Sequence, residues 1–403
     1  MKILVLNSGS SSQKSALYEL GDALPSDPPE PLWEASIEWS GGSAKTRIRS
    51  LDRKVSDDHT VAADRKSAIQ QMLRSLWTGR SQVIRNTAEI NMVGHRIVHG
   101  GQKLTKATVI TPEVEDIISS VAAFAPLHNR AELEGIEIIN QLVGLVTQVA
   151  VFDTGFHRTL PLPAAVYPGP YEWFEGGIRR YGFHGINHEY CTQRAAQLLR
   201  SHLASLRLVS CHLGNGCSLA AISGGESVDT TMGFTPLEGL MMGTRSGSVD
   251  PGILTYLLRQ NAMPWQQLDD LLNKNSGLLG ISGVSGDMRE IISALRTGNP
   301  RAKLAFDIYV HRLQAGIASM VAAMGGLDAL VFTAGVGEHS PEVRAATCEK
   351  LGFLGVQLDP EKNEKSPADQ DISCAGSPVR VLIIHAQEDW AIAKACWEIA
   401  RSK

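Results

Sequence analysis

The stretch that decides the fold is His212-Leu-Gly-Asn-Gly-Cys-Ser218. An apolar run at 206–211 precedes it and another at 219–222 follows it, so the pattern predicts two buried strands joined by a tight turn. Glycines at 214 and 216 permit positive φ angles and let a ligand approach bare backbone. Successive N–H groups in such a turn can bind phosphate, although a plain hairpin turn is the simpler interpretation of this stretch alone.

Two other parts of the chain repeat this layout. The N-terminus carries the strand 3–6, a polar turn at 7–13, and then Lys14 with a second apolar-rich stretch. Residues 328–338 form a further strand that runs into a glycine turn. Two similar hairpins about half a chain apart predict an α/β fold made of duplicated domains with a nucleotide cleft between them.

Length and composition exclude several classes of protein. The chain has 403 residues, 43% of them hydrophobic and 20% charged, as in an ordinary globular protein of two or three domains. We expect an N-terminal lobe at 1–150 plus about 385–403 and a C-terminal, nucleotide-binding lobe at 151–384. The net charge of −4 gives no global electrostatic case for binding nucleic acid or membrane. The six cysteines form no CxxC pair and no apolar run reaches transmembrane length, so we expect free thiols and a cytoplasmic protein.

Outside the hairpins, the pattern predicts ordinary elements. Helices are expected at 300–324 and at 390–402, with the last one packed on the first half of the chain. The segment 154–185 is rich in proline, glycine and aromatic residues, and we interpret it as a substrate lid. Residues 277–289 are expected to be a glycine/serine loop, and residues 33–52 one or two exposed strands.

The candidate chemistry is that of an anion site. No GxxxxGK[ST], no strand–helix GxGxxG and no GxSxG motif is present. The sequence therefore argues against a P-loop enzyme, a Rossmann dinucleotide-binding protein and an α/β-hydrolase. His95 and His99 lie on a predicted strand, where the i,i+4 spacing does not suit zinc. Taken singly, a buried arginine usually pairs with a core acid. Taken together, these residues suit a phosphoryl-transfer site. Donors to the phosphoryl group would be Arg96, His184, His212 and Arg245, and ligands for Mg²⁺ would be Asp153 and Glu388.

Eight motifs in order show that the chain resembles the acetokinase family, within the superfamily of actin, hexokinase and the heat-shock chaperones. The resemblance covers nearly the whole chain, and so many motifs in order make it highly specific. The motifs are Asn7-Ser-Gly-Ser-Ser-Ser12-x-Lys14, Gly94-His-Arg-Ile-Val-His-Gly-Gly101, Pro126-Leu-His-Asn129, Phe152-Asp-Thr154, Tyr181-Gly-Phe-His-Gly185, His212-Leu-Gly-Asn-Gly216, Pro236-Leu-Glu-Gly239 with Met242-Gly-Thr-Arg245, and Phe332-Thr-Ala-Gly335-x-Gly-Glu338.

The resemblance implies a fold, a reaction and an assembly. The fold would be a pair of actin-like (ribonuclease H-like) ATPase domains. The reaction would be ATP + acetate ⇌ ADP + acetyl phosphate, with Mg²⁺ or, in its place, Mn²⁺. The assembly would be a homodimer. Because a carboxylate is already ionised at neutral pH, the enzyme needs no general base and the transfer is expected to be direct and in line.

The resemblance also assigns roles to matching positions. The expected catalytic residues are Arg96, Asp153, His184 and Arg245. The metal environment would comprise Asn7, Asp153 and Glu388. The acid would be held by Arg96 and by an apolar pocket of Val98, Leu127, Phe183 and Pro236. Nucleotide contacts would be Lys14, His212, Leu213, Gly214, Asn215, Gly216, Asp287, Met288, Arg289, Gly335, Val336 and Gly337. The other active-site positions would be Ser10, Ser12 and His128.

The chain departs from the common family pattern at a few positions. Ile186-Asn187 stands where a Thr-Ser pair is more usual, and His339 stands in place of an asparagine. Ala386-Gln387 replaces a usual Thr-Asn just before Glu388, and Ser248 stands where many members have aspartate.

Several alternatives remain open from the sequence. A propionate kinase of the same family is the main one. A sugar or polyol kinase would use Asp153 as a base, since an alcohol must lose its proton. An ATP-driven chaperone or filament protein is the non-enzyme alternative. A phosphoenzyme at Glu388 is the alternative to direct transfer.

Overall fold

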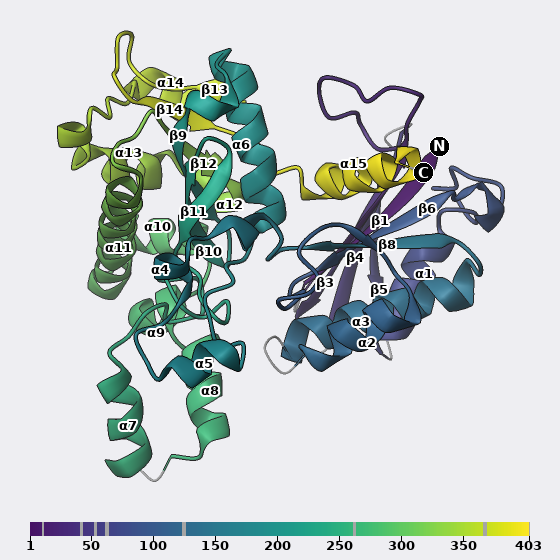
Figure 1. Cartoon of the computed structure of the whole chain (residues 1–403), viewed down its shortest axis with the longest axis horizontal. Coiled ribbons are helices and arrows are strands. Elements are labelled where there is room, and N and C mark those ends of the chain that lie inside the picture. Colours follow the sequence, from purple (N-terminus) through teal and green to yellow (C-terminus); the bar gives the residue numbers. More distant parts are fainter. Residues whose placement is uncertain are drawn as a thin grey trace. The chain divides into compact units, whose positions relative to one another are not determined.

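Figure 1 shows the computed structural model of the chain. The structure describes residues 1–9, 12–40, 43–51, 55–60, 64–122, 126–260, 263–365 and 369–402, and of these the side chains at 40, 55–60, 126–128 and 260 lie outside the description. The chain divides into two compact units, Met1–Phe156 with Gln387–Lys403, and His157–Ala386. Each unit is built on one mixed sheet, so the α/β class expected from the sequence is confirmed.

The first unit contains an eight-stranded sheet in the order β5-β4-β3-β2-β1-β6-β8-β7. β1 pairs antiparallel with β2, which places Asn7 opposite Lys14, and it pairs parallel with β6, which is in turn parallel to β8. The strands are β1 (Lys2–Ser8), β2 (Ser12–Glu19), β3 (Trp33–Ser40), β4 (Ser43–Ser50), β5 (Val55–Thr60), β6 (Met92–Ile97), β7 (Thr108–Val109) and β8 (Thr147–Phe152).

Helices cover both faces of this sheet, with α1, α2 and α3 on one side and α15 on the other (Figure 1). The core on the first side includes Leu4 and Leu6 of β1 and Trp33 of β3, all buried. The expectation of exposed strands at 33–52 is therefore wrong in part, because β3 and β4 alternate buried and exposed side chains as one-sided strands do. The helical elements are α1 (Arg65–Arg74), η1 (Thr87–Glu89), α2 (Pro112–Ser120), α3 (Pro126–Leu142) and α15 (Glu388–Arg401).

The C-terminal helix α15 packs on β1 and β6, as the sequence predicts for the last helix. Gly94 of β6 makes this contact close. A Cβ placed there would lie 2.5 Å from Ile392 Cγ2 and 2.7 Å from Cys396 Sγ. A glycine is thus required where α15 crosses the strand that carries Arg96.

The second unit contains a six-stranded sheet in the order β11-β10-β9-β12-β14-β13. The hairpin predicted around His212–Ser218 is confirmed, with β9 antiparallel to β10 and Leu213 opposite Cys217. β9 is also parallel to β12, just as β1 is parallel to β6 in the first unit. The strands are β9 (Arg207–Leu213), β10 (Cys217–Ser223), β11 (Glu226–Thr230), β12 (Ala329–Thr333), β13 (Gln370–Asp371) and β14 (Arg380–Ile383).

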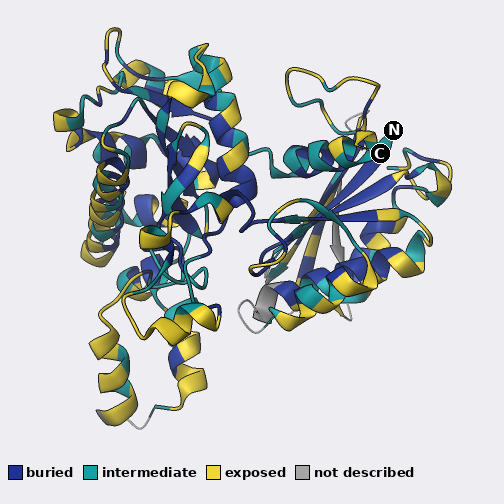
Figure 2. Ribbon diagram, viewed as in Figure 1, coloured by how far each residue is buried: buried dark blue, intermediate teal, exposed yellow. Residues whose placement is uncertain are grey.

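The helices of the second unit surround a sheet whose central strands are buried on both faces, dark blue in Figure 2. The helix expected at 300–324 is confirmed as α11. The helical elements are η2 (Phe156–Thr159), α4 (Leu162–Ala165), α5 (Tyr171–Glu175), α6 (Gly185–Leu199), η3 (Leu203–Ser205), α7 (Pro251–Gln260), α8 (Trp265–Lys274), α9 (Gly277–Ser282), α10 (Met288–Arg296), α11 (Pro300–Met324), α12 (Ala334–His339), α13 (Pro341–Glu349), η4 (Gly352–Leu354) and α14 (Pro360–Lys365).

Two expectations for glycine-rich segments are wrong, the one for 277–289 only in part, because residues 283–287 do form a loop. The start of 277–289 is the helix α9, not a loop. The glycines at 335 and 337 lie inside the short helix α12, not in a turn. In both cases glycine suggested a loop, whereas one glycine of each helix lies close to neighbouring backbone. A Cβ at Gly277 would lie 2.2 Å from the carbonyl oxygen of Met242, and one at Gly337 would lie 3.3 Å from the carbonyl carbon of Phe332.

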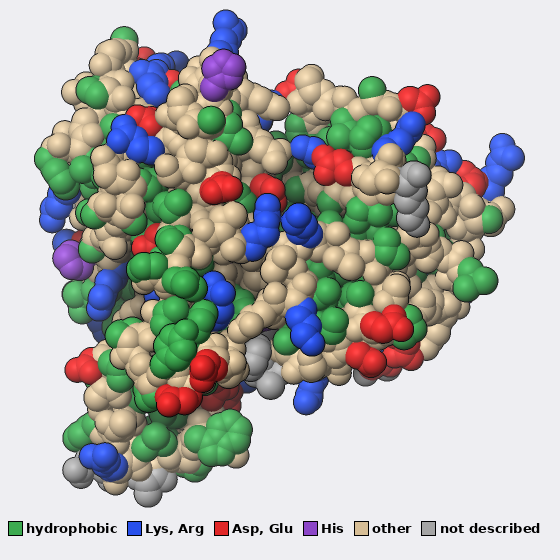
Figure 3. Space-filling view, in the orientation of Figure 1, with side chains coloured by type: hydrophobic (Ala, Val, Ile, Leu, Met, Phe, Trp, Pro, Cys, Tyr) green, Lys and Arg blue, Asp and Glu red, His purple; other side chains and the backbone are tan. Residues whose placement is uncertain are grey.

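The surface carries acidic and basic side chains intermixed on the face drawn in Figure 3. Exposed apolar side chains occur on α7 and α8, where Ile253, Tyr256 and Trp265 are 47%, 60% and 69% exposed. Within the described part of the chain, no helix combines the length and the apolar character needed to cross a membrane.

Candidate functional site

In the first unit, polar side chains gather at one edge of the sheet. Asn7 lies near the end of β1, Arg96 near the end of β6, and Asp153 directly after β8. β6 lies between β1 and β8 and is parallel to both, so the carboxyl ends of the three strands meet at the same edge, where ligands of α/β sheets bind. Glu388 and Asp389 join them from the first turn of α15.

Arg96 and Asp153 form a buried ion pair. Nε and Nη2 of Arg96 both donate to Oδ2 of Asp153, at 3.1 and 2.5 Å, and Asp153 is 0% exposed. Burial disfavours the charged guanidinium, but the nearby carboxylates of Asp153 and Glu388 outweigh burial and raise the pKa of Arg96. The pair keeps a fixed cation at the sheet edge, and Nη1 of Arg96 reaches on to Oδ1 of Asn7 at 3.3 Å.

Asn7 connects the arginine to two acids. Its amide nitrogen donates to Glu388 Oε2 at 3.1 Å and to Asp389 Oδ1 at 2.9 Å. Burial raises the pKa of the Asp389 carboxyl, while the Asn7 bond and the charge of Lys14 act in the opposite direction. Sequence reasoning singled out Glu388 and missed Asp389. The only available signal for Asp389 was its position next to Glu388 at a helix start.

This group of side chains fits a divalent cation in its donor chemistry. Carboxylate oxygens of Glu388 and Asp389 are the hard ligands that Mg²⁺ prefers, and Mg²⁺ usually takes only one or two protein carboxylates and completes its shell with water and phosphate. Two carboxylates are the number offered here: among the described residues, no group of three or more His, Cys, Asp or Glu side chains is arranged to hold a metal. Oδ2 of Asp153, a residue expected among the ligands, accepts from Arg96.

Val98 lies just beyond β6 and is 3% exposed. Its backbone N–H donates to both carboxylate oxygens of Glu132 on α3, at 3.1 and 3.0 Å. Glu132 is 2% exposed, and burial raises the pKa of its carboxyl to about 8 against the opposing charge of Arg96. Sequence reasoning missed Glu132, although it shares the buried face of α3 with Asn129 and Ile136 at helical spacing.

The remaining site residues expected in the first unit lie on the β1–β2 hairpin and at the start of α3. Lys14 is exposed on β2 opposite Asn7, and the backbone oxygen of Ser12 accepts from Gly9 N at 2.8 Å. Ser10 and the side chains of Leu127 and His128 lie outside the described residues.

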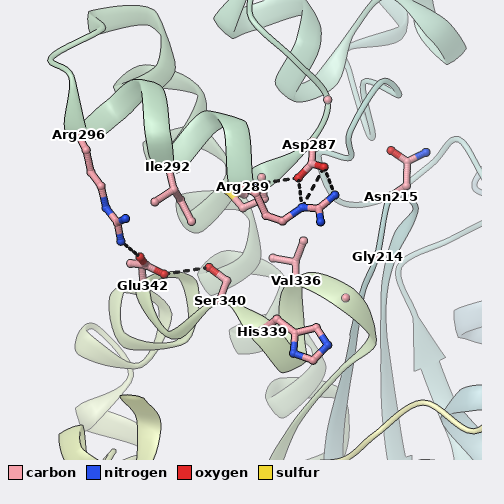
Figure 4. Close-up of a pocket in the computed structure, with 13 residues that line it drawn as sticks. Gly214, Asn215, Asp287, Arg289, Ile292, Arg296, Val336, His339, Ser340 and Glu342 are labelled. Atoms are coloured by element: carbon pink, nitrogen blue, oxygen red, sulfur yellow. Dashed lines mark hydrogen bonds and ion pairs between the residues drawn. The ribbon is translucent and has the colours of Figure 1, made fainter. Parts of the chain in front are cut away.

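In the second unit, a pocket of about 590 Å³ lies beside the β9–β10 turn (Figure 4). It is lined by Gly214, Asn215, Gly286, Asp287, Met288, Arg289, Ile292, Arg296, Gly335, Val336, His339, Ser340 and Glu342. The expected nucleotide contacts on this lining are Gly214, Asn215, Asp287, Met288, Arg289, Gly335 and Val336. Leu213 and Gly337 do not line the pocket and are buried.

Two ion pairs shape the pocket wall. Asp287 caps α10 by accepting from Arg289 N at 2.9 Å, and its carboxylate also accepts from the Arg289 guanidinium, which lowers the pKa of Asp287 (Figure 4). Arg296 pairs with Glu342 at 2.6 Å. Sequence reasoning did not assign Ile292 or Arg296 to the site, although they follow Met288 and Arg289 at helical spacing along α10.

The turn itself collects nitrogen donors around its glycines. A Cβ at Gly216 would lie 3.4 Å from Arg245 Nη1 and 3.5 Å from His184 Nε2, and one at Gly214 would lie 3.5 Å from His212 Nε2. Three side-chain nitrogens therefore lie close to the backbone of this turn. Arg245 is also held by the carbonyl oxygen of Pro236 at 3.1 Å.

The two histidines stack on each other, with ring centroids 4.0 Å apart and planes 10° from parallel. His184 has φ of 57°, a left-handed conformation that a non-glycine residue adopts at a cost and that is common at functional sites. Its Nδ1 lies 2.9 Å from Ser218 Oγ, which lies 2.8 Å from Nε2 of buried His188. Burial holds the pKa of His188 well below its usual range, so this ring is neutral.

Comparison with known proteins places the chain in a family. The model of the Acetokinase family matches residues 2–394. The chain belongs to the acetokinase family. Acetate kinase from Gloeobacter violaceus is 58% identical over 405 residues, covering 100% of both chains, and acetate kinase from Trichormus variabilis is 57% identical over 402 residues, covering 99% of both.

Two solved structures match the fold of this chain over nearly its whole length. The crystal structure of Porphyromonas gingivalis acetate kinase has a TM-score of 0.90 at 38% identity and covers 99% of both chains. A propionate kinase from Francisella tularensis has a TM-score of 0.87 at 37% identity and covers 98% of both. The family indicated by the ordered motifs is thus confirmed, and with it the expectation of a kinase.

Other polar residues singled out from the sequence contact groups of the protein itself. His95 and His99, whose spacing argued against a zinc site, make hydrogen bonds within the protein. His95 Nε2 lies 2.7 Å from Gln148 Oε1, and His99 Nδ1 accepts from Gly101 N at 2.9 Å. Arg180, in the segment expected to be a lid, pairs with Glu238 at 2.7 Å.

Proposed function

We propose that the chain catalyses reversible phosphoryl transfer from ATP to acetate, giving ADP and acetyl phosphate. The observation that carries the proposal is the full-length match, at 58% and 57% identity, to proteins named acetate kinase. The chemistry of the two units supports it. One unit offers a fixed arginine beside carboxylates, and the other offers a pocket beside a ring of nitrogen donors.

We assign different roles to the hydrogen-bond donors of the two units. Arg245, His184 and His212 present N–H groups around Gly214 and Gly216, where they would stabilise charge on a transferring phosphoryl group. Arg96, oriented by Asp153, would hold the carboxylate of the acid. Direct in-line transfer needs no base and no covalent enzyme intermediate, because the acid arrives already ionised.

We assign the cation site to Glu388 and Asp389, with Asn7 orienting both carboxylates through its amide N–H group. A bound Mg²⁺ would neutralise phosphate charge and orient the nucleotide, and Mn²⁺ has the same preference for oxygen ligands. We assign Asp153 to holding Arg96, since its Oδ2 already accepts two hydrogen bonds from that side chain.

The acid specificity is proposed to be for acetate, with propionate as the second candidate. The Francisella tularensis propionate kinase has nearly the same fold, so fold alone does not select the acid. We propose that Val98, Phe183 and Pro236 limit the length of the acid. Val98 and Phe183 are buried and Pro236 is half-buried.

Trapping of the product as its hydroxamate tests the reaction. The full-length chain with ATP, Mg²⁺ and saturating acetate should yield acetyl hydroxamate after hydroxylamine is added. Matched reactions contain propionate, a hexose or glycerol in place of acetate. No hydroxamate from acetate would overturn the proposal. More product from propionate would make the chain a propionate kinase, and ADP release with hexose alone would favour a sugar kinase.

We further propose a homodimer that resides in the cytoplasm. Exposed apolar side chains on α7 and α8 offer surface that association would bury. All six cysteines are free, as in proteins of a reducing compartment. Sedimentation equilibrium should give twice the chain mass of 43.5 kDa, and a monomer mass at micromolar concentration would contradict the dimer.

A further inference from the structure

Asn187 lies in the first turn of α6 and is 0% exposed. Its amide nitrogen is 2.9 Å from Nδ1 of His212 and 3.3 Å from the hydroxyl of Thr333. Its amide oxygen faces the Sγ of Cys191 at 3.7 Å. A buried amide is thus directed at one ring nitrogen of a histidine whose other ring nitrogen lies beside Gly214.

The amide nitrogen has two hydrogens, and its lone pair is delocalised into the carbonyl group, so it can only donate. Nδ1 of His212 must therefore accept, which requires a lone pair on that atom. A neutral imidazole with a lone pair on Nδ1 carries its one hydrogen on Nε2. A protonated His212 would turn an N–H group toward the hydrogens of the amide, and the bond would be lost.

His184, stacked on His212, is held differently. Its Nδ1 meets the hydroxyl of Ser218, and a hydroxyl can donate or accept. His184 can thus be neutral or cationic without losing this bond. Because the rings are 4.0 Å apart, two positive charges would repel each other, so at most one ring is charged.

We infer that Asn187 is a positioning residue that keeps His212 neutral and protonated on Nε2, so that His212 is a constant hydrogen-bond donor beside the Gly214–Gly216 turn and any positive charge of the stacked pair belongs to His184. The tautomer follows from the local hydrogen bonds. Its consequence for catalysis rests on the proposed function, in which the turn binds a phosphoryl group.

The chemistry of the side chain at position 187 decides the tautomer. A serine hydroxyl could donate or accept, and would leave the tautomer of His212 open. Aspartate has the shape of asparagine but only accepts, so it would require a hydrogen on Nδ1.

The test is histidine ¹⁵N NMR on the full-length protein without substrates, near neutral pH. Long-range ¹H–¹⁵N spectra distinguish protonated from unprotonated ring nitrogens. The signals of His212 are identified by their absence in His212→Gln. His157 is an internal control, since its Nε2 donates to the carbonyl oxygen of Phe183 at 3.1 Å and its tautomer is therefore known.

The wild-type protein should show His212 protonated on Nε2 and unprotonated on Nδ1. Asn187→Asp should move the proton to Nδ1 or add one there, Asn187→Ser should give a mixture, and His157 should not change. A wild-type His212 that carries hydrogen on Nδ1 would overturn the inference without any variant. So would an unchanged His212 in a folded Asn187→Asp protein.

The catalytic consequence is measured separately. Where Asn187→Asp takes the hydrogen away from Nε2, kcat for acetyl phosphate formation should fall by about 100-fold, as loss of one oriented donor does, with a smaller change in the KM for ATP. Unchanged kcat with a switched tautomer would overturn the catalytic role. If the wild type forms no acetyl phosphate, the proposed function fails while the tautomer readout still stands.

Discussion

The two units bring together polar side chains by opposite means. In the first unit the site is ionic: Arg96 and Asp153 are a buried pair, with Glu388 and Asp389 nearby. In the second unit the groups around the glycine turn are held largely by neutral partners, among them the hydroxyl of Ser218. Two similar hairpins thus support two different kinds of site.

The difference indicates what each site tolerates. A buried ion pair is costly to break because the remaining charge has no solvent. Neutral hydrogen bonds to histidine cost less to lose, but they decide where a proton lies and which way a donor points. Substitutions in the first unit should therefore affect folding as well as catalysis, and those in the second unit mainly catalysis.

Replacement of Arg245 should have the largest effect on activity. Arg245→Ala removes a cation beside Gly216, and kcat should fall by about 10³-fold or more, as for phosphoryl-transfer arginines. Added guanidinium should restore part of the rate. Steady-state kinetics and thermal unfolding, measured together, should show lost kcat with little lost stability. An unchanged kcat would assign Arg245 to structure.

Replacement of Arg96 should show the opposite balance. Arg96→Ala leaves the carboxylate of Asp153, 0% exposed, without its guanidinium, and should lower the free energy of unfolding by about 3–5 kcal/mol. Urea unfolding measures this. The double variant Arg96→Ala, Asp153→Asn should recover much of the stability but no activity. If the single variant is as stable as Arg245→Ala, the contrast between the units is wrong.

Glu132 should make stability depend on pH. Burial raises the pKa of its carboxyl in the folded state to about 8, from an ordinary value of 4.5. The folded protein holds this proton more tightly than the unfolded chain, so the contribution is fully present below pH 4.5 and is lost as pH rises through about 8. Glu132→Gln should flatten the unfolding free energy across that window, by at most about 1.4 kcal/mol per pH unit.

The control for Glu132 is on the same helix. Glu137 is exposed on α3, and Glu137→Gln should leave the pH dependence of stability as in the wild type. Equal pH profiles for the wild type and Glu132→Gln would show that Glu132 is ionised in the folded protein throughout the window.

Local pattern predicted the parts of the fold that repeat or that are long. Both hairpins were predicted from two apolar runs with a polar or glycine-rich turn between them, and the helix at 300–324 from its apolar pattern. The family was indicated by the order of the motifs. Glycine misled at α9 and α12, because a glycine can also lie where backbone packs closely, as Gly277 and Gly337 do. Propensity alone does not distinguish the two uses.

The supporting residues of the site were harder to predict. Asp389, Glu132 and Asn187 have no motif of their own, and each acts through a partner far away in sequence: Asn7, the backbone of Val98, and His212. Such partners become neighbours only through the sheet order and the packing of α3, α6 and α15. A single sequence carries no record of that proximity.

The smallest expected effect concerns the choice of acid. Val98 is buried next to the segment that carries Arg96, and its backbone is fixed by Glu132. Removing its two methyl groups should enlarge the space behind the carboxylate, and one methylene in an apolar pocket is worth ~1–3 kcal/mol. Val98→Ala should shift the kcat/KM ratio of acetate to propionate toward propionate by roughly 10-fold, within the 10–200-fold limit of such pockets. Ile97→Val, a core change on the neighbouring strand position, is the control for stability and should leave the ratio unchanged. A Val98→Ala protein that is merely less stable, with the wild-type ratio, would place Val98 in the core and the acid pocket elsewhere.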